Sequence, residues 1–194
     1  MTDWNDTPTL SGEHVRLEPL TRDHAKGLFE AGADPEVWTW LSVRQPVDLV
    51  QTEQMIDVML SDPARRAWAQ IDAHTGDVAG TTSYYQVVPP HRILSIGHTW
   101  IGRPWQRTPL NTESKLLLLR RAFDDLDAQR VAWETDLRNE RSQRAIERLG
   151  ARREAVLRAH RIRPDGTSRD TVVYSVTAEE WPGVAEGLRT RLSR

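Results

Sequence analysis

The alternation of apolar and polar residues along this chain predicts seven β-strands. In the stretch 14–20, Val15 and Leu17 alternate with Arg16 and Glu18, which is typical of a strand with one buried face. Runs rich in β-branched and aromatic residues, bounded by turn residues, predict the other strands at 66–71, 78–88, 93–101, 130–137, 154–162 and 170–176. Two tight turns are expected within this set, at Thr75-Gly76-Asp77 and at Pro164-Asp165-Gly166.

Helical spacing of apolar residues predicts the remaining elements, at 21–31, 47–60, 112–126 and 139–149, with a final helix after Thr177. Thr177 and Glu180 have the spacing of a capping box, and Gly150 is placed to end the helix before it. Helices return between strands late in the chain but not in its middle, which predicts a mixed α/β sheet rather than a doubly wound parallel one. We expect one domain over 1–194, with a core at about 11–178 and a C-terminal helix at about 178–193.

Composition excludes several classes of function. The net charge of −2 provides no electrostatic footprint for nucleic acid or for an anionic membrane surface. The chain has no cysteine, so thiolate nucleophiles, Cys-ligated zinc and disulfides are excluded, and the histidines show no metal-like spacing. No signal peptide and no apolar stretch of ~20 residues is seen, so no membrane span and a cytoplasmic location are predicted.

The most informative stretch is Thr99 to Glu113, TWIGRPWQRTPLNTE, where a predicted strand enters a loop that opens a helix. Helix N-termini carry unpaired N–H groups and a partial positive charge, so they bind phosphate well. Asn111 or Thr112 is the expected cap of this helix. Asn111 also tolerates the left-handed backbone that loops around phosphate often require.

The stretch resembles the pyrophosphate loop of the GCN5-related N-acetyltransferases (GNAT superfamily), within them the RimJ/RimL-type enzymes that modify protein N-termini. The family's Q/R-x-x-G-x-G/A frame is occupied by Gln106 to Asn111, and Thr112-Glu113 matches the Thr-Glu that often follows. Asn139-Glu140-Arg141-Ser142, with Leu149-Gly150, is similar to the family's N-x-x-S…LG helix. The stretch from Glu154 to Tyr174 is similar to its closing hairpin, through Glu154, Leu157-Arg158, Asp165-Gly166, Arg169-Asp170 and Tyr174. The resemblance implies the GNAT acyl-CoA N-acyltransferase fold, with a central mixed, mostly antiparallel seven-stranded sheet flanked by helices. The sheet would split between the strands ending at Ile101 and Leu137, which would admit the pantetheine arm.

The resemblance also implies acetyl-CoA as cofactor and a set of residues that bind it. Thr99, Trp100 and Ile101 would run beside the pantetheine arm, and Asn139 and Ser142 would reach the pantetheine and the thioester sulfur. The pyrophosphate would be wrapped by Gln106, Arg107, Thr108, Pro109, Leu110, Asn111 and Thr112. Two of these depart from the family pattern, because Pro109 has no N–H and Asn111 places a side chain where Gly or Ala is usual. Arg107 offers a compensating charge.

Four residues are candidates for the chemistry. Glu134 stands at the offset of a catalytic glutamate in the family's ribosomal alanine acetyltransferases, and a cleft carboxylate can act through water as general base. Ser142 is a candidate proton donor to the leaving sulfur, and Tyr174 is a weaker candidate for that role. A neutral His98 can accept a proton from the amine. The alternatives are an ion-paired strand glutamate, a serine that contacts only cofactor or backbone, a core tyrosine and a structural histidine.

The acceptor is expected to be an amine. At pH 7, deprotonation costs about 1 kcal/mol for an α-amine and about 4.6 kcal/mol for a lysine, which favours a protein or peptide N-terminus. Trp38 and Trp40 fall where the family's acceptor pocket is built, and core packing is their alternative. Direct attack on the thioester is expected, because the best covalent nucleophile, Cys, is absent. The alternatives are a small-molecule acetyltransferase of the antibiotic or polyamine type and a non-catalytic CoA-binding module, and a homodimer is compatible with the resemblance.

Overall fold

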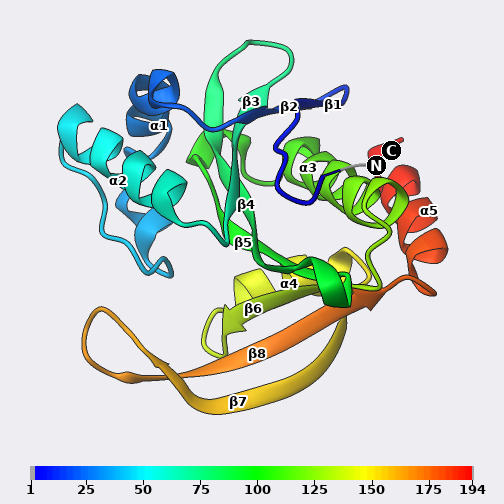
Figure 1. The fold of residues 1–194 in the computed structure, drawn as a ribbon. Coiled ribbons are helices and arrows are strands. Elements are labelled where there is room, and N and C mark those ends of the chain that lie inside the picture. The colour runs from blue at the N-terminus through cyan, green and yellow to red at the C-terminus, as the bar shows by residue number, and fades with distance from the viewer. Residues whose placement is uncertain (1–2, 194) are drawn as a thin grey trace.

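Eight strands lie side by side in the part of the chain that the computed structural model describes, residues 3–193 (Figure 1). Their order is β1-β2-β3-β4-β5-β6-β8-β7, and every neighbouring pair is antiparallel except β5 and β6, which run parallel. The termini of the predicted domain, residues 1–2 and 194, lie outside the described residues. The strands are β1 Leu10–Ser11, β2 Val15–Pro19, β3 Arg66–Asp72, β4 Val78–Val88, β5 Ile93–Ile101, β6 Arg130–Asp136, β7 Arg152–Ile162 and β8 Ser168–Thr177.

Helices cover both faces of this sheet, as Figure 1 shows, with α1 and α2 on one side and α3 and α5 on the other. The helices are α1 Ala25–Ala31, α2 Leu49–Ser61, α3 Pro109–Arg120, α4 Glu140–Arg148 and α5 Trp181–Leu192. Each side has its own apolar core. Leu28, Ile56 and Trp100 belong to the core under α1 and α2, whereas Leu118, Ile146 and Leu188 belong to the core under α3, α4 and α5.

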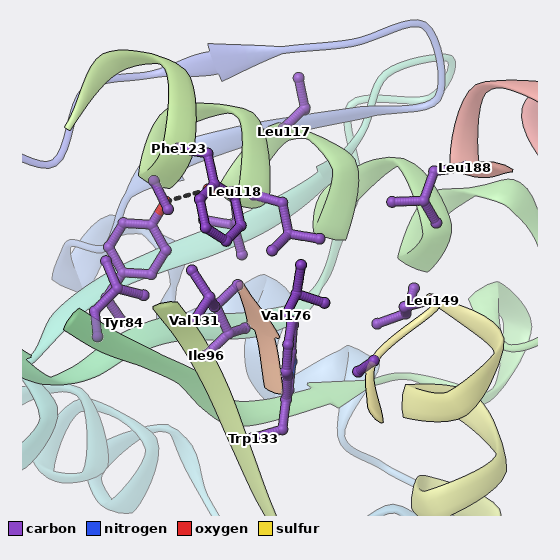
Figure 2. Close-up of a cluster of buried hydrophobic side chains, with 14 of the residues drawn as sticks. Tyr84, Ile96, Leu117, Leu118, Phe123, Val131, Trp133, Leu149, Val176 and Leu188 are labelled. Atoms are coloured by element: carbon purple, nitrogen blue, oxygen red, sulfur yellow. Dashed lines mark hydrogen bonds between the residues drawn. The ribbon is translucent and has the colours of Figure 1, made fainter. Parts of the chain in front are cut away.

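The larger core fixes α3 over the middle of the sheet. Figure 2 shows Leu117 and Leu118 of α3 above Tyr84, Ile96 and Val131, which come from three neighbouring strands. The Tyr84 hydroxyl is fully buried and donates a hydrogen bond to the backbone carbonyl of Leu118. Because a buried tyrosine hydroxyl needs a partner, this bond sets the position of α3 along the strand below it.

Glu113 fixes the start of α3 to the turn between β1 and β2 and to the first residue of β2. Its buried carboxylate accepts hydrogen bonds from the backbone N–H groups of Glu13, His14 and Val15, at 2.9, 2.6 and 2.9 Å. The carboxylate lies where a side chain on Gly12 would stand, since a Cβ there would be 2.3 Å from the carboxyl carbon. Charge-assisted hydrogen bonds of this kind are strong, so this end of the helix is held in place.

The mixed α/β sheet predicted from the sequence is confirmed, with eight strands rather than seven. The additional strand, β1, has only two residues, which is too short for an alternating pattern. Two helix starts were predicted wrongly. α3 begins at Pro109 rather than at Thr112, and α5 begins at Trp181 rather than directly after Thr177. The Glu180 side chain still accepts a hydrogen bond from the Thr177 backbone, but the residues between them form a turn before α5.

Candidate active site

The sheet opens between β5 and β6, the two parallel strands. They pair only at their first residues, Ile93–Ser95 against Arg130–Ala132, and have no register beyond that point. The edge of β5 from Ile96 to Ile101 that faces β6 therefore has no strand partner. The split predicted between the strands ending at Ile101 and Leu137 is confirmed. Backbone N–H and C=O groups along such an edge are free to pair with an extended ligand.

A bulge at His98 shapes the β5 side of this opening. The register between β4 and β5 shifts between the pairs Ser83–Gly97 and Thr81–Trp100, and His98 has a left-handed φ of 48°. The extra residue bends the strand and changes the direction of its side chains. Histidine is among the residues that tolerate this conformation better than most.

The loop before α3 leaves several polar groups without partners. Arg107 is left-handed, with φ of 64°, and directly precedes the N-cap residue Thr108, whose hydroxyl accepts from the Leu110 backbone. Within residues 3–193, the backbone N–H groups of Arg107 and Thr108 have no hydrogen-bond acceptor. The Oδ1 atom of Asn111 is buried and also has no partner there. Unpaired donors at the N-terminus of a twelve-residue helix suit a pyrophosphate.

Two details of this loop differ from those predicted. Thr108, rather than Asn111 or Thr112, caps the helix, and Arg107, rather than Asn111, has the left-handed backbone. The first difference follows from Pro109, which occupies the first helical position. Proline is favoured there because the N–H that it lacks would have no partner within the helix. Pro109 therefore starts the helix three residues earlier than predicted.

Gln106 ties the loop to the end of β5. Its side-chain amide donates to the Ile101 carbonyl at 3.0 Å, and its backbone N–H donates to Arg103. The exposed Arg107 side chain has no ion-pair partner within residues 3–193. The loop thus carries one exposed, unpaired positive charge at Arg107, while Gln106 holds the loop against the end of β5.

Helix α4 brings two predicted residues to its first turn. Asn139 is the N-cap, and its side-chain oxygen accepts from the Ser142 backbone N–H at 3.0 Å. The Ser142 hydroxyl is half-buried and makes no hydrogen bond within the described chain. Both residues follow the end of β6, so they lie on the β6 side of the opening. The Asn139 amide nitrogen and the Ser142 hydroxyl remain available as donors.

Glu134 and His98 lie near each other, on opposite sides of the opening. Glu134 lies on the sheet face opposite the core residues Val131 and Trp133 and forms an ion pair with Arg161 of β7 at 2.8 Å. His98 is close enough to Glu134 and Arg161 for their charges to act on its pKa. That pKa is lowered to about 4, first by desolvation in the pocket and then by Arg65 and Arg161. At pH 7 the imidazole is therefore neutral.

A small pocket lies beside His98, under α2 and the loop before it. It has a volume of about 40 Å³ and is lined by Leu41, Ser42, Val43, Met55, Met59, Arg65, Thr81, His98 and Trp100. Trp38 and Trp40, predicted to bind the acceptor, are not among these residues. Trp38 is buried against Trp100 at a ring-centre distance of 5.1 Å, and Trp40 is exposed. Their placement favours packing for Trp38.

Tyr174 is fully buried in β8, and its hydroxyl donates to Glu147 of α4 at 2.9 Å. Burial and that hydrogen bond raise the pKa of Tyr174 to about 12.

Thr99, predicted to run beside the pantetheine, hydrogen-bonds through its side chain to Thr82 and Lys115, at 2.8 and 3.1 Å. Trp100 is buried, and Thr112 and Ile101 are half-buried.

Three residues near the opening were not predicted from the sequence. Lys115 is buried below the bulge, Arg65 lines the pocket, and Tyr85 packs edge-on against His98 at 5.0 Å. Nothing in the local sequence distinguishes Arg65 from the adjacent Arg66, or Lys115 from an exposed helix residue. Only the pairing of β3, β4 and β5 brings them to the site.

The described residues contain no group of three or more acidic or histidine side chains that can hold a metal ion. None of the helices in that part of the chain has the length and apolar character needed to cross a membrane.

Comparison with known proteins identifies the family to which the chain belongs. The model of the acetyltransferase (GNAT) domain matches residues 14–152. The crystal structure of a protein from T. thermophilus, provisionally assigned as an acetyltransferase, shares 45% identity at a TM-score of 0.89, covering 98% of this chain and 100% of its own. A GCN5-related N-acetyltransferase from Brucella melitensis gives a TM-score of 0.93 at 31% identity, over 96% of this chain and 86% of that one.

A curated relative is YdaF of Bacillus subtilis (strain 168), provisionally assigned as a ribosomal N-acetyltransferase. It is 28% identical over 125 residues, which are 61% of this chain and 67% of YdaF. The domain match spans well over half of the chain, and the solved relatives share its fold over nearly the full length. The chain therefore belongs to the GNAT family of acetyltransferases and is an acyltransferase enzyme.

Proposed function

We propose that this enzyme transfers the acetyl group of acetyl-CoA directly to an amine, with a protein or peptide N-terminal α-amine as the favoured acceptor. The observation that supports this most is the opening between β5 and β6, which has different chemistry on its two sides. The donors at the start of α3 and α4 lie toward one face of the sheet. Glu134, His98 and the small pocket lie toward the other. A donor and an acceptor can thus meet from opposite faces.

The residues present suit the cofactor. Arg107 and Thr108 offer unpaired backbone N–H groups to its pyrophosphate, and the unpaired edge of β5 offers backbone groups to its amides. Bound acetyl-CoA supplies an acetyl group already activated as a thioester. The fixed positions of the loop and of α3 reduce the entropy lost when the reactants are brought together.

Side chains of the enzyme then remove the proton of the amine and stabilise the leaving sulfur. Glu134 accepts the proton of the amine through a water, while the neutral His98 accepts a hydrogen bond from the acceptor and orients it. The weak basicity of His98 makes it a poorer base than an imidazole of ordinary pKa. The Ser142 hydroxyl donates a hydrogen bond to the departing sulfur, which then takes its proton from solvent. Tyr174 has no part in this scheme, because its hydroxyl is buried and bonded to Glu147.

Two observations bear on the acceptor. An α-amine is easier to deprotonate than a lysine for an enzyme without a strong base, and YdaF is provisionally assigned as a ribosomal N-acetyltransferase. A small-molecule acceptor is the second candidate, and the pocket volume of about 40 Å³ favours it, because only a small group fits. The two differ in whether residues beyond the first of a peptide improve the reaction.

The test has a binding part and a turnover part. Millimolar acetyl-CoA should raise the melting temperature clearly, because a ligand that binds only the folded state stabilises it. Thiol release should then be followed with peptide N-termini, lysine peptides, polyamines and aminoglycosides. No thermal shift in a stable protein would refute the cofactor assignment. A shift together with turnover of only polyamines or aminoglycosides would refute the N-terminal acceptor.

Replacing Glu134 tests its role as base. We expect Glu134→Gln to lower the rate by about 10²-fold or more, the usual range for general-base catalysis, and to leave the acetyl-CoA thermal shift intact. Glu154→Gln is the matched control, since Glu154 forms a comparable ion pair with Arg130 away from the pocket. Full activity of Glu134→Gln from pH 6 to 9 would remove this residue from the mechanism.

A further inference from the structure

Arg65 extends into the small pocket with most of its hydrogen-bonding capacity unused. It directly precedes β3, and its Nε donates to the Ser83 hydroxyl at 2.9 Å. Within residues 3–193, its two terminal nitrogens make no hydrogen bond, and no carboxylate lies within ion-pair distance. The same guanidinium group lines the pocket together with His98, Thr81 and Trp100.

The surroundings do not neutralise this charge. Asp62, whose charge acts on the pKa of Arg65, forms no ion pair with it and instead accepts a hydrogen bond from the Ala64 backbone. Glu134 is already paired with Arg161. Burial lowers the pKa of Arg65 to about 10, so the group is still a cation at neutral pH. A partly buried cation without a counter-ion is unfavourable, and an anion from outside would remove that penalty.

The pocket is sized for a small anionic group. Its volume of about 40 Å³ is space for roughly three waters, given that one needs about 10–15 Å³. A carboxylate fits this space, and the planar guanidinium fork binds carboxylates through two parallel hydrogen bonds. Thr81 and the neutral His98 line the same pocket and are polar partners for the rest of the acceptor.

We propose that Arg65 binds a carboxylate of the acceptor, so that the enzyme prefers an amine carrying an acidic group close by. This rests on the proposed function, since it assumes that the pocket beside His98 receives the acceptor. Two sources provide the same chemistry: the α-carboxylate or side-chain carboxylate of a free amino acid, and an acidic side chain near the N-terminus of a peptide. Either places the carboxylate at Arg65 while the amine enters the opening beside Glu134.

The experiment compares acceptors that differ only in charge. Peptides with Glu or Gln as second residue form one pair, and glutamate with its diamide forms the other, each measured as kcat/KM by thiol release. We expect the wild-type enzyme to favour the acidic member of at least one pair by about tenfold to a hundredfold, the range for a charge-assisted contact. The pair that shows the preference identifies the source of the carboxylate.

Arg65→Gln should abolish this preference while the acetyl-CoA thermal shift and turnover of the uncharged acceptor are retained. The Gln amide can still reach the Ser83 hydroxyl, so folding is expected to be preserved. Arg65→Lys should retain part of the preference, because it keeps the charge but loses the fork. Arg44→Met is the matched control, since Arg44 is exposed on the loop that borders the pocket but does not line it.

Two results would overturn the proposal while leaving the proposed function standing. One is an equal kcat/KM of the wild-type enzyme for the acidic and the amide acceptor of both pairs. This measurement requires no variant. The other is a preference that survives Arg65→Gln, or Arg65→Lys if the Gln variant does not fold. By contrast, an enzyme that shows no acetyl-CoA thermal shift and turns over no amine would refute the proposed function itself.

Discussion

Two basic side chains, Arg65 and Lys115, lie next to the opening without an acidic partner in residues 3–193. They differ in what surrounds them. Arg65 lines a pocket, so its charge can meet a ligand. Lys115 is enclosed between α3 and the sheet, and its Nζ donates to the hydroxyls of Thr82 and Thr99, at 2.9 and 3.1 Å. An amine enclosed in this way is stable only if it gives up its proton readily, and desolvation indeed lowers its pKa to about 7.

Lys115 predicts a dependence of stability on pH. The unfolded lysine has a pKa near 10.4, so between pH 7 and 10 the unfolded chain binds more protons and stability rises with pH. Lys115→Met removes this effect and leaves Thr82 and Thr99 bonded to each other. Between pH 7 and pH 10, the free energy of unfolding should therefore rise by roughly 2–4 kcal/mol more in the wild-type than in Lys115→Met.

The measurement is urea denaturation of both proteins at pH 7, 8, 9 and 10. The other lysine of the chain, Lys26, is exposed on α1, so Lys26→Met is the control and should run parallel to the wild-type at every pH. Parallel curves for the wild-type and Lys115→Met would show that Lys115 does not release its proton on folding.

At the scale of elements, α3 is positioned by contacts that local sequence does not reveal. Thr108 and Pro109 determine where the helix begins, and Glu113 determines where it lies. The sequence placed Glu113 in the cofactor loop by resemblance, whereas the structure turns it to the backbone of residues 13–15. The carboxylate thus connects α3 to the turn between β1 and β2. The loop depends on it, because a shift of α3 would move the donors of Arg107 and Thr108.

Glu113→Ala should destabilise the protein by about 2–4 kcal/mol, because it leaves three backbone donors without their acceptor. Glu113→Gln keeps one accepting oxygen and should lose about half as much. Thermal and urea denaturation measure both. Glu186→Ala, at an exposed position of α5, should change stability little. A Glu113→Ala variant as stable as that control would mean that the hydrogen bonds from residues 13–15 to Glu113 do not contribute to stability.

At the scale of the whole molecule, the sheet is continuous from β1 to β5 and again through β6, β8 and β7, but the two parts join over three residues only. Figure 1 shows β7 and β8 extending away from the helices that cover the rest of the sheet. Every residue of β7 is exposed, and β7 is an edge strand. The predicted homodimer, the cytoplasmic location and the single domain over 1–194 remain predictions.

The opening predicts where a cofactor protects the backbone. Acetyl-CoA should slow amide hydrogen exchange in residues 96–101 of β5 and in residues 107–112, because groups there lack partners in the free protein. Exchange in β7 should not change. Mass-spectrometric exchange with and without acetyl-CoA provides the comparison. Protection confined to other segments would place the cofactor elsewhere on the molecule.

Much of this protein was determined by sequence alone, because secondary structure follows local periodicity. The sequence predicts seven strands, helices α2 and α4, and the turns at Gly76 and Gly166 close to their observed bounds. Both glycines have the positive φ that such turns need. The opening between β5 and β6 was also predicted, since the resemblance covered the order of elements around it. The start of α3 was missed, although Thr108-Pro109 is itself a helix-start signal.

Tertiary structure alone decided the roles of side chains that are distant in sequence. Arg65 and His98 are far apart along the chain, and only the pairing of β3, β4 and β5 gives them one pocket. The enclosure of Lys115, the use of Glu113 as an anchor and the burial of Tyr174 likewise depend on what packs above each residue. Periodicity indicates which face of an element is buried, whereas desolvation and charge pairing depend on neighbours from other elements. For this reason the fold was predictable and the acceptor chemistry was not.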